Sequence, residues 1–126
     1  MRLEDSYYQI VRETVEGREG RFRIRLLPDC PVYRGHFPGN PVSPGVCNIR
    51  TIQECACRVA GERLFIATIK RCRLTALVSP AICPELDVEV RLSPADTGFT
   101  VEARMTEAGV TYVEYTGEMR SAVEGR

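Results

Sequence analysis

Apolar and polar residues alternate along much of the chain, with the period of two that is typical of half-buried β-strands. In the run 21–27, large apolar side chains alternate with three arginines, so one face of the expected strand is apolar and the other is charged. The run 99–106 is the longest alternation of this kind. The pattern predicts strands over 7–15, 21–27, 64–77 (one bent strand or two short ones), 86–92, 99–106 and 110–119.

A period close to four residues replaces this alternation between Pro44 and Ala60 and predicts a helix. Ser43 suits the N-cap, Pro44 the first helical position and Gly61 the C-terminal stop. One face of this helix is an apolar stripe formed by Ile49, Ile52, Ala56 and Val59. Another face carries charged residues spaced by four, namely Arg50, Glu54 and Arg58.

The segment 28–43 is expected to be a long, stiff loop, because four prolines and two glycines interrupt any regular element. The order of two strands, loop, one helix and about four further strands predicts an α+β fold with one antiparallel sheet. A single helix cannot cover both faces of such a sheet. Either the sheet wraps round the helix, or a second subunit supplies the remaining cover.

Length and composition place the chain among ordinary globular proteins. Its 126 residues predict a single domain, residues 1–126, with 44% hydrophobic and 27% charged residues. Seventeen basic residues balance seventeen acidic ones, so no overall field attracts nucleic acid, and the low net charge favours self-association. The charged N-terminus is unlike a secretory signal, and no apolar run approaches the ~20 residues of a membrane span. We expect a cytoplasmic protein.

The six cysteines are expected to be small buried hydrophobic side chains. No C-x-x-C pair is present, and a single histidine leaves little for a zinc site. Cys47 is the expected exception, because it lies near a predicted helix N-terminus, where a thiolate is stabilised. The six are Cys30, Cys47, Cys55, Cys57, Cys72 and Cys83.

The stretch from His36 to Val46 reads HFPGNPVSPGV. It resembles the signature H-F-P-G-x-P-x-x-P-G of the β-hydroxyacyl-acyl carrier protein dehydratases of the FabZ and FabA type. The order of elements also resembles their hot-dog fold, an antiparallel sheet of about five to six strands wrapped round one long central helix.

This resemblance implies a lyase of fatty acid or related lipid biosynthesis. Such an enzyme removes water from a 3-hydroxyacyl thioester on acyl carrier protein and leaves the trans-2-enoyl thioester, with no cofactor and no metal. It also implies a homodimer or higher even oligomer, with active sites at the interface and acyl carrier protein as partner.

The resemblance places the catalytic histidine at His36, and imidazole suits a base that removes the C2 proton. Gly45 falls in the first helical turn, where unpaired backbone N–H groups and the helix dipole favour an oxyanion. We expect Phe37, Val46 and Asn48 to contact the substrate.

The family's acidic helix residue falls on Arg50, fourteen positions after His36. Arginine stays protonated and does not exchange protons usefully, but it could polarise the 3-hydroxyl. Glu54 lies one turn later, about 40° away round the helix, where FabZ-type enzymes usually carry glutamine. It could supply the missing acid. Alternatively, Arg50, Glu54 and Arg58 form an ordinary ladder of ion pairs.

Two other functions fit the same residues. In a hot-dog thioesterase, Glu54 would activate water against the thioester carbonyl. In a non-catalytic subunit, the chain would bind acyl groups or carrier protein without turnover. The basic run Lys70, Arg71 and Arg73 is either a docking surface for the acidic carrier protein or a solvated strand.

Overall fold

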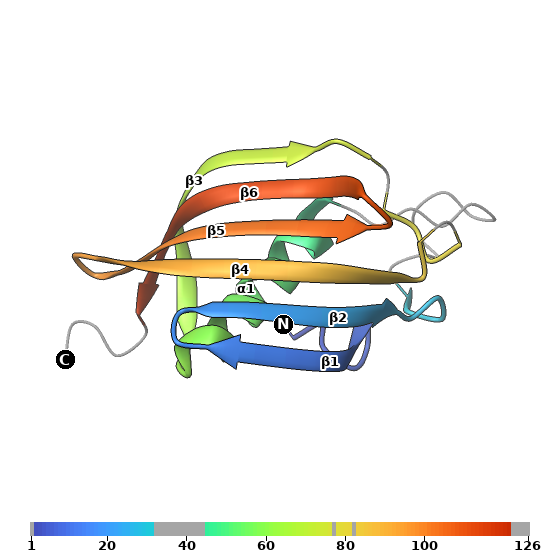
Figure 1. The fold of residues 1–126 in the computed structure, drawn as a ribbon, viewed down its shortest axis with the longest axis horizontal. Helices are drawn as coiled ribbons and strands as arrows, with labels where there is room; N and C mark the ends of the chain where they lie inside the picture. The colour runs from blue at the N-terminus through green and yellow to red at the C-terminus, as the bar shows by residue number, and fades with distance from the viewer. Residues whose placement is uncertain (1, 32–44, 77, 82, 122–126) are drawn as a thin grey trace.

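The computed structural model describes residues 2–31, 45–76, 78–81 and 83–121. Within these ranges, six strands form one antiparallel sheet and a helix of 16 residues lies against it (Figure 1). The elements are β1 (Tyr8–Glu16), β2 (Glu19–Leu26), α1 (Gly45–Ala60), β3 (Leu64–Leu74), β4 (Glu85–Ala95), β5 (Gly98–Glu107) and β6 (Val110–Ser121).

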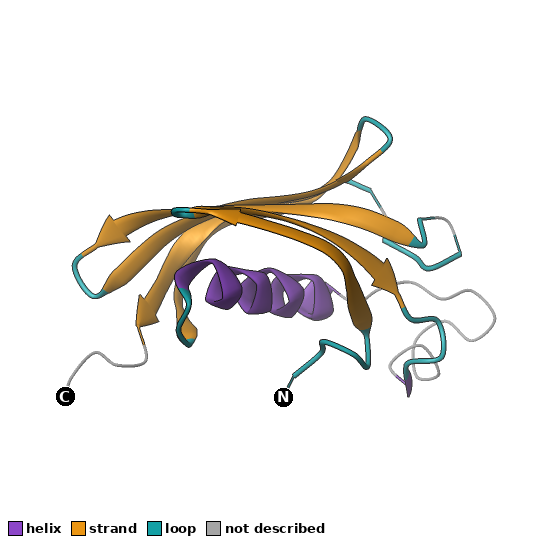
Figure 2. Cartoon of the chain, turned by 60° about the horizontal axis from the view of Figure 1, so that its bottom comes forward, coloured by secondary structure: helices purple, strands orange, loops and turns teal. Residues whose placement is uncertain are grey.

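The strand order across the sheet is β1-β2-β4-β5-β6-β3. The helix follows β2 in the chain, and β3 follows the helix but pairs with β6 at the far edge of the sheet. Figure 2 shows that the sheet curves over α1, so one helix covers its concave face. The predicted α+β class and hot-dog arrangement are therefore confirmed, and the sheet wraps round the helix.

The apolar half of each alternating run forms the core between sheet and helix. In β2, Phe22, Ile24 and Leu26 are at most 1% exposed. The inward faces of β4 and β5 are also buried, and α1 adds three of the four residues of the predicted stripe, the fourth, Ile49, being only partly buried. The residues concerned are Val88, Val90, Leu92, Val101, Ala103 and Met105 from the strands, and Ile52, Ala56 and Val59 from the helix.

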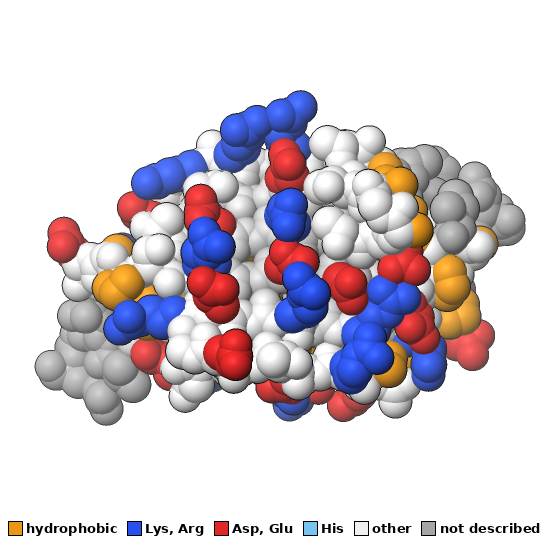
Figure 3. Space-filling view, in the orientation of Figure 1, with side chains coloured by type: hydrophobic (Ala, Val, Ile, Leu, Met, Phe, Trp, Pro, Cys, Tyr) orange, Lys and Arg blue, Asp and Glu red, His pale blue; other side chains and the backbone are white. Residues whose placement is uncertain are grey.

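The polar half of the alternation covers the convex face with charges of both signs (Figure 3). Arg21 of β2 and Arg104 of β5 both donate to Glu89 of β4, over 2.8 and 2.9 Å. The strand register sets Arg21 opposite Glu89 and Glu89 opposite Arg104. Opposite charges facing one another across strands stabilise the sheet while keeping this face polar.

The helix ends where its C-terminal signal predicted, whereas the predicted N-cap Ser43 and first helical residue Pro44 lie outside the described residues. The first hairpin turns at Gly17 and Arg18, and Gly17 has a φ of 59° that suits glycine. The helix begins at Gly45 and stops at Gly61, whose φ is 72°. The segment predicted over 64–77 is a single strand that ends at Leu74 and contains two register shifts. In the described part of the chain, no helix has the length and hydropathy to cross a membrane.

Candidate active site at the start of helix α1

The first turn of α1 meets the end of β3. Gly45 begins the helix, and a Cβ atom added there would lie 3.1 Å from Cδ1 of Leu74. The first N–H groups of a helix have no partner within it, so this turn presents donors and the positive end of the helix dipole. The predicted partners His36 and Phe37 lie outside the described residues, and their roles stay predictions.

A pocket of about 240 Å³ opens beside this turn, lined by Leu3, Val46, Cys47 and Arg50. Val46 is 71% exposed, whereas Leu3 and Cys47 are buried. The structure thus brings two of the predicted substrate contacts, Val46 and Arg50, to one pocket. The sequence did not predict Leu3 as a residue of this pocket, since nothing in the charged N-terminal run indicates that Leu3 reaches the helix.

Arg50 is held in place by the next turn of its own helix. Its Nε donates to Glu54 over 3.2 Å, and one terminal nitrogen donates to Oε1 of Gln53 over 3.0 Å. Gln53 in turn donates to the carbonyl of Leu64 over 2.9 Å. The Arg50 side chain is 34% exposed. A guanidinium fixed in this way is pre-organised for polar contact with a ligand in the pocket.

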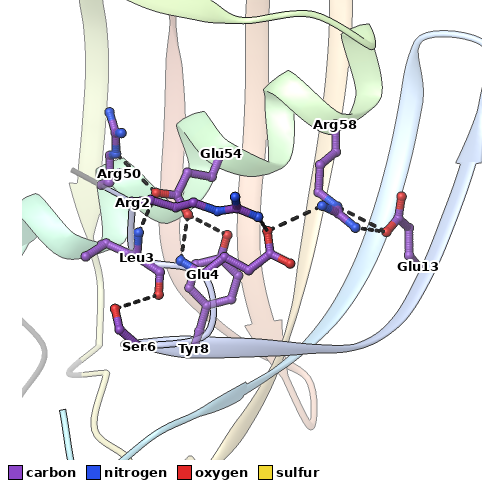
Figure 4. Close-up of polar contacts among 9 residues, drawn as sticks. All are labelled: Arg2, Leu3, Glu4, Ser6, Tyr8, Glu13, Arg50, Glu54 and Arg58. Atoms are coloured by element: carbon purple, nitrogen blue, oxygen red, sulfur yellow. Dashed lines mark hydrogen bonds and ion pairs between the residues drawn. The ribbon is translucent and has the colours of Figure 1, made fainter.

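Glu54 accepts bonds from the N-terminal segment as well as from Arg50 (Figure 4). The backbone N–H groups of Leu3 and Glu4 donate to it over 2.7 and 3.0 Å, and the Tyr8 hydroxyl donates over 2.8 Å. Its side chain is only 12% exposed. Glu54 therefore faces neither bulk solvent nor an open site, and its predicted role as the acid stays a prediction.

The predicted ladder of ion pairs along α1 is present only in part. Arg50 pairs with Glu54, but Arg58 pairs with Glu13 of β1 over 2.9 Å and with Glu4 over 3.3 Å (Figure 4). Arg58 pairs with these two residues and not with Glu54 one turn away, because the N-terminal segment (residues 2–8) and β1 pack against this face of the helix.

Asn48 lies beneath the N-terminal segment. It is 2% exposed, and its side-chain oxygen accepts a bond from the hydroxyl of Tyr7 over 3.4 Å. This contact joins the segment to the first turns of α1. The predicted contact between Asn48 and substrate stays a prediction.

Cys47 corrects one expectation. Burial raises the pKa of its thiol, and the neighbouring Cys30 adds to the effect. Desolvation of the thiolate thus outweighs the helix N-terminus, and Cys47 is not an activated nucleophile. Cys30, Cys47, Cys55 and Cys83 are buried free thiols, as expected of small apolar side chains, while Cys57 and Cys72 are partly exposed.

Among the residues that the structure describes, no cluster of three His, Cys, Asp or Glu side chains could hold a metal ion. What the site does contain is a helix N-terminus, a fixed guanidinium and apolar walls. These groups can bind a carbonyl oxygen, either neutral or carrying negative charge, next to an aliphatic chain.

Curated relatives match this chain over part of its length. The 3-hydroxyacyl-[acyl-carrier-protein] dehydratase FabZ of Levilactobacillus brevis is 34% identical over 65 residues, which is 46% of this chain and 44% of that protein. The FabZ of Pelotomaculum thermopropionicum is 32% identical over 84 residues, 61% of this chain and 59% of that protein. The chain thus spans about half the length of the curated relatives that it matches.

Solved structures share the fold across nearly the whole chain. The dehydratase heterocomplex ApeI:P from Xenorhabdus doucetiae contains a chain with a TM-score of 0.71 and 16% identity, covering 89% of this chain and 96% of that one. An uncharacterized protein from Erwinia carotovora subsp. atroseptica gives a TM-score of 0.63 at 16% identity, covering 93% and 94%. The model of the ApeI-like family, described as ApeI dehydratase, matches residues 12–113. This chain belongs to the ApeI-like dehydratase family.

Proposed function

We propose that this protein dehydrates a 3-hydroxyacyl thioester carried by acyl carrier protein to the trans-2-enoyl thioester. The observation that carries the proposal is the family match over residues 12–113, combined with a dehydratase signature that leads directly into the first turn of α1. The FabZ relatives are named as dehydratases of such substrates, which supports the same reaction here.

In the proposed reaction, His36 removes the proton from C2 of the substrate. The electron pair of that bond forms the C2–C3 double bond as the C3–O bond breaks. The 3-hydroxyl departs as water with the proton that protonated His36 returns to it. Charge that develops on the thioester oxygen is stabilised by the N–H groups at the start of α1, near Gly45. The absence of a side chain at Gly45 allows the thioester to approach the backbone. Phe37 and Val46 line the acyl path.

The leaving hydroxyl needs a polarising group or a proton donor. Arg50 occupies the family's acid position and is fixed beside the pocket, so we assign it to polarise the hydroxyl by its charge. Glu54 is the other candidate from the sequence. No cofactor enters this scheme, since proton transfers alone complete it.

We further propose that the chain acts in the cytoplasm as one hot-dog domain that assembles into a homodimer or a higher even oligomer. The free edge of β3 supports the assembly, because it exposes Phe65, Ile69 and Leu74, and Leu74 lies beside the start of α1. Acyl carrier protein is acidic in this family, and the exposed basic side chains of β3 supply a complementary surface. These are Lys70, Arg71 and Arg73.

The test is incubation of the purified protein with a 3-hydroxyacyl carrier protein, followed by mass spectrometry of the acyl group. We expect loss of water without release of free thiol, and a decrease of at least about 100-fold in His36→Ala, as for loss of a general base. Absence of enoyl product, or equal rates in both proteins, would contradict the proposal. Thiol release instead would identify a thioesterase.

A second candidate is a non-catalytic subunit that binds the acyl group and pairs with an active dehydratase. It is favoured by Arg50 at the acid position, and a protein of the same fold occurs in a structure described as a dehydratase heterocomplex. The same assay separates the two functions. A non-catalytic subunit binds a 3-hydroxyacyl analogue but releases no enoyl product on its own.

A further inference from the structure

The carboxylate of Glu54 joins two parts of the protein that are far apart in the sequence. Its four donors come from Leu3, Glu4, Tyr8 and Arg50, at distances of 2.7, 3.0, 2.8 and 3.2 Å. Three of these donors belong to the N-terminal segment, 46 to 51 residues away. With a side chain that is 12% exposed, Glu54 has most of its acceptor capacity occupied by these donors.

The N-terminal segment forms a compact turn that depends on this anchor. The carbonyl of Leu3 accepts bonds from the backbone N–H groups of Ser6 and Tyr7, over 3.1 and 2.8 Å. The Tyr7 hydroxyl reaches Asn48 in α1 over 3.4 Å. Leu3 itself is 6% exposed and packs in the core. Figure 4 shows Glu54 between this turn and Arg50.

The residues that Glu54 holds are also residues of the pocket. Two of the described residues that line it are bonded to Glu54: the backbone N–H of Leu3 and the Nε of Arg50 both donate to its carboxylate. The apolar wall and the cationic wall of the pocket are thus both bonded to one carboxylate. Val46 and Cys47, from the first turn of α1, also line the pocket.

We propose that Glu54 is a positioning residue that sets the shape of the acyl pocket, and that the segment around Leu3 is a wall of the substrate site. This rests on the proposed function, since it deepens the account of the same site. Every partner of Glu54 among the described residues is a donor, as expected for a carboxylate that accepts bonds. Glu54 acts by holding Leu3 and Arg50, and the protons of the reaction pass through other groups.

The test compares wild-type protein with Glu54→Gln. Glutamine keeps the size but replaces one acceptor oxygen by an NH₂ group, which faces donors. We expect hydrogen exchange of the Leu3 and Glu4 amides to become at least about tenfold faster, because the bonds that protect them weaken. We also expect KM to rise by about tenfold and kcat to change by less than about threefold, as for a change of binding rather than of the chemical step.

Two variants make the result specific. Glu13→Gln is the matched control, since Glu13 is a carboxylate bonded to Arg58 and is remote from the pocket lining. We expect it to leave KM and the two amides unchanged. Tyr8→Phe keeps the carboxylate but removes one donor, so we expect it to shift KM in the same direction as Glu54→Gln, but less.

An acid role gives a different outcome. If Glu54 protonates the leaving group, Glu54→Gln lowers kcat by about 100-fold or more and removes a limb of the pH profile of kcat. That result would overturn the proposal. Binding of a 3-hydroxyacyl pantetheine amide needs no turnover, so it tests the role of Glu54 even if the proposed dehydratase function fails. The Kd of this amide should rise in Glu54→Gln even if the wild-type protein dehydrates no substrate. An unchanged Kd would overturn the proposal.

Discussion

Arg50 is the residue at which this chain departs most clearly from the dehydratase pattern. The sequence left open whether its side chain was free or paired. It is paired with Glu54 and Gln53, and it lines the pocket beside the start of α1. A cation held in this way can polarise a hydroxyl group but cannot protonate it efficiently, so the leaving-group step is expected to be slow.

Arg50→Glu tests this consequence at the residue scale. It restores the acid of the family pattern, and we expect the rate of dehydration to rise by at least about tenfold, with a new alkaline limb in the pH profile of kcat. Arg50→Gln, which removes the cation without adding an acid, is the control and should not raise the rate. An equal gain in both variants would show that the cation inhibits and that no acid is needed there.

At the scale of elements, the sheet is joined by charges as well as by its backbone. Arg23 of β2 donates to Glu85 over 3.0 Å and to Asp87 over 3.3 Å, both in β4, and reaches Glu107 of β5 over 2.5 Å. One arginine thus links three strands. Bonds from Arg23 lower the pKa of Glu85 and of Glu107 below the ordinary glutamate value.

This cluster predicts how stability depends on pH. A carboxyl whose pKa is lower in the folded state adds stability above its unfolded pKa of about 4.3, and the contribution is lost as pH falls through the lower folded value. Arg23→Gln should therefore lower the urea midpoint at pH 7, and the difference from wild type should shrink at pH 3. Urea unfolding curves at the two pH values measure this.

The control for this experiment is Arg91→Gln. Arg91 also links β2 and β4, through Glu19 over 3.5 Å, but both side chains are largely exposed, at 63% and 66%. Such a pair contributes little, so its removal should change neither midpoint appreciably. If the urea midpoints of Arg23→Gln and wild type differ by the same amount at pH 7 and pH 3, the assigned role of Arg23 is contradicted.

At the scale of the whole molecule, the two edges of the sheet differ in what they expose. The β3 edge carries Phe65 and Ile69, which are 51% and 45% exposed, and it ends at Leu74 beside the candidate site. The β1 edge carries Val11 and Val15 at 42% and 37%. The larger apolar side chains on the β3 edge, which ends beside the site at Leu74, favour pairing with a second copy along β3.

Ile69→Asp should therefore convert the assembled protein to monomers, because a buried, unpaired carboxylate is costly at an interface. Light scattering coupled to size-exclusion chromatography measures the mass. Val11→Asp on the β1 edge is the matched control and should leave the assembly intact. If Val11→Asp dissociates the protein and Ile69→Asp does not, the assembly forms through β1 instead.

The sequence by itself determined the strands and the C-terminal end of α1. These depend on signals within a few residues, namely the period of apolar side chains and the position of glycine and proline. It also predicted a helix over residues 44–60 that continues from the end of the dehydratase signature, and the described part of that helix is Gly45–Ala60.

Only the tertiary structure decided what the polar side chains of α1 do. Glu54 binds the N-terminal segment and Arg58 binds Glu4 and Glu13, because folding brings together residues about 50 positions apart, and no local pattern records which donor reaches which carboxylate. The raised pKa of Cys47 is of the same kind, since burial is a property of the packed molecule and outweighs the local effect of a helix N-terminus.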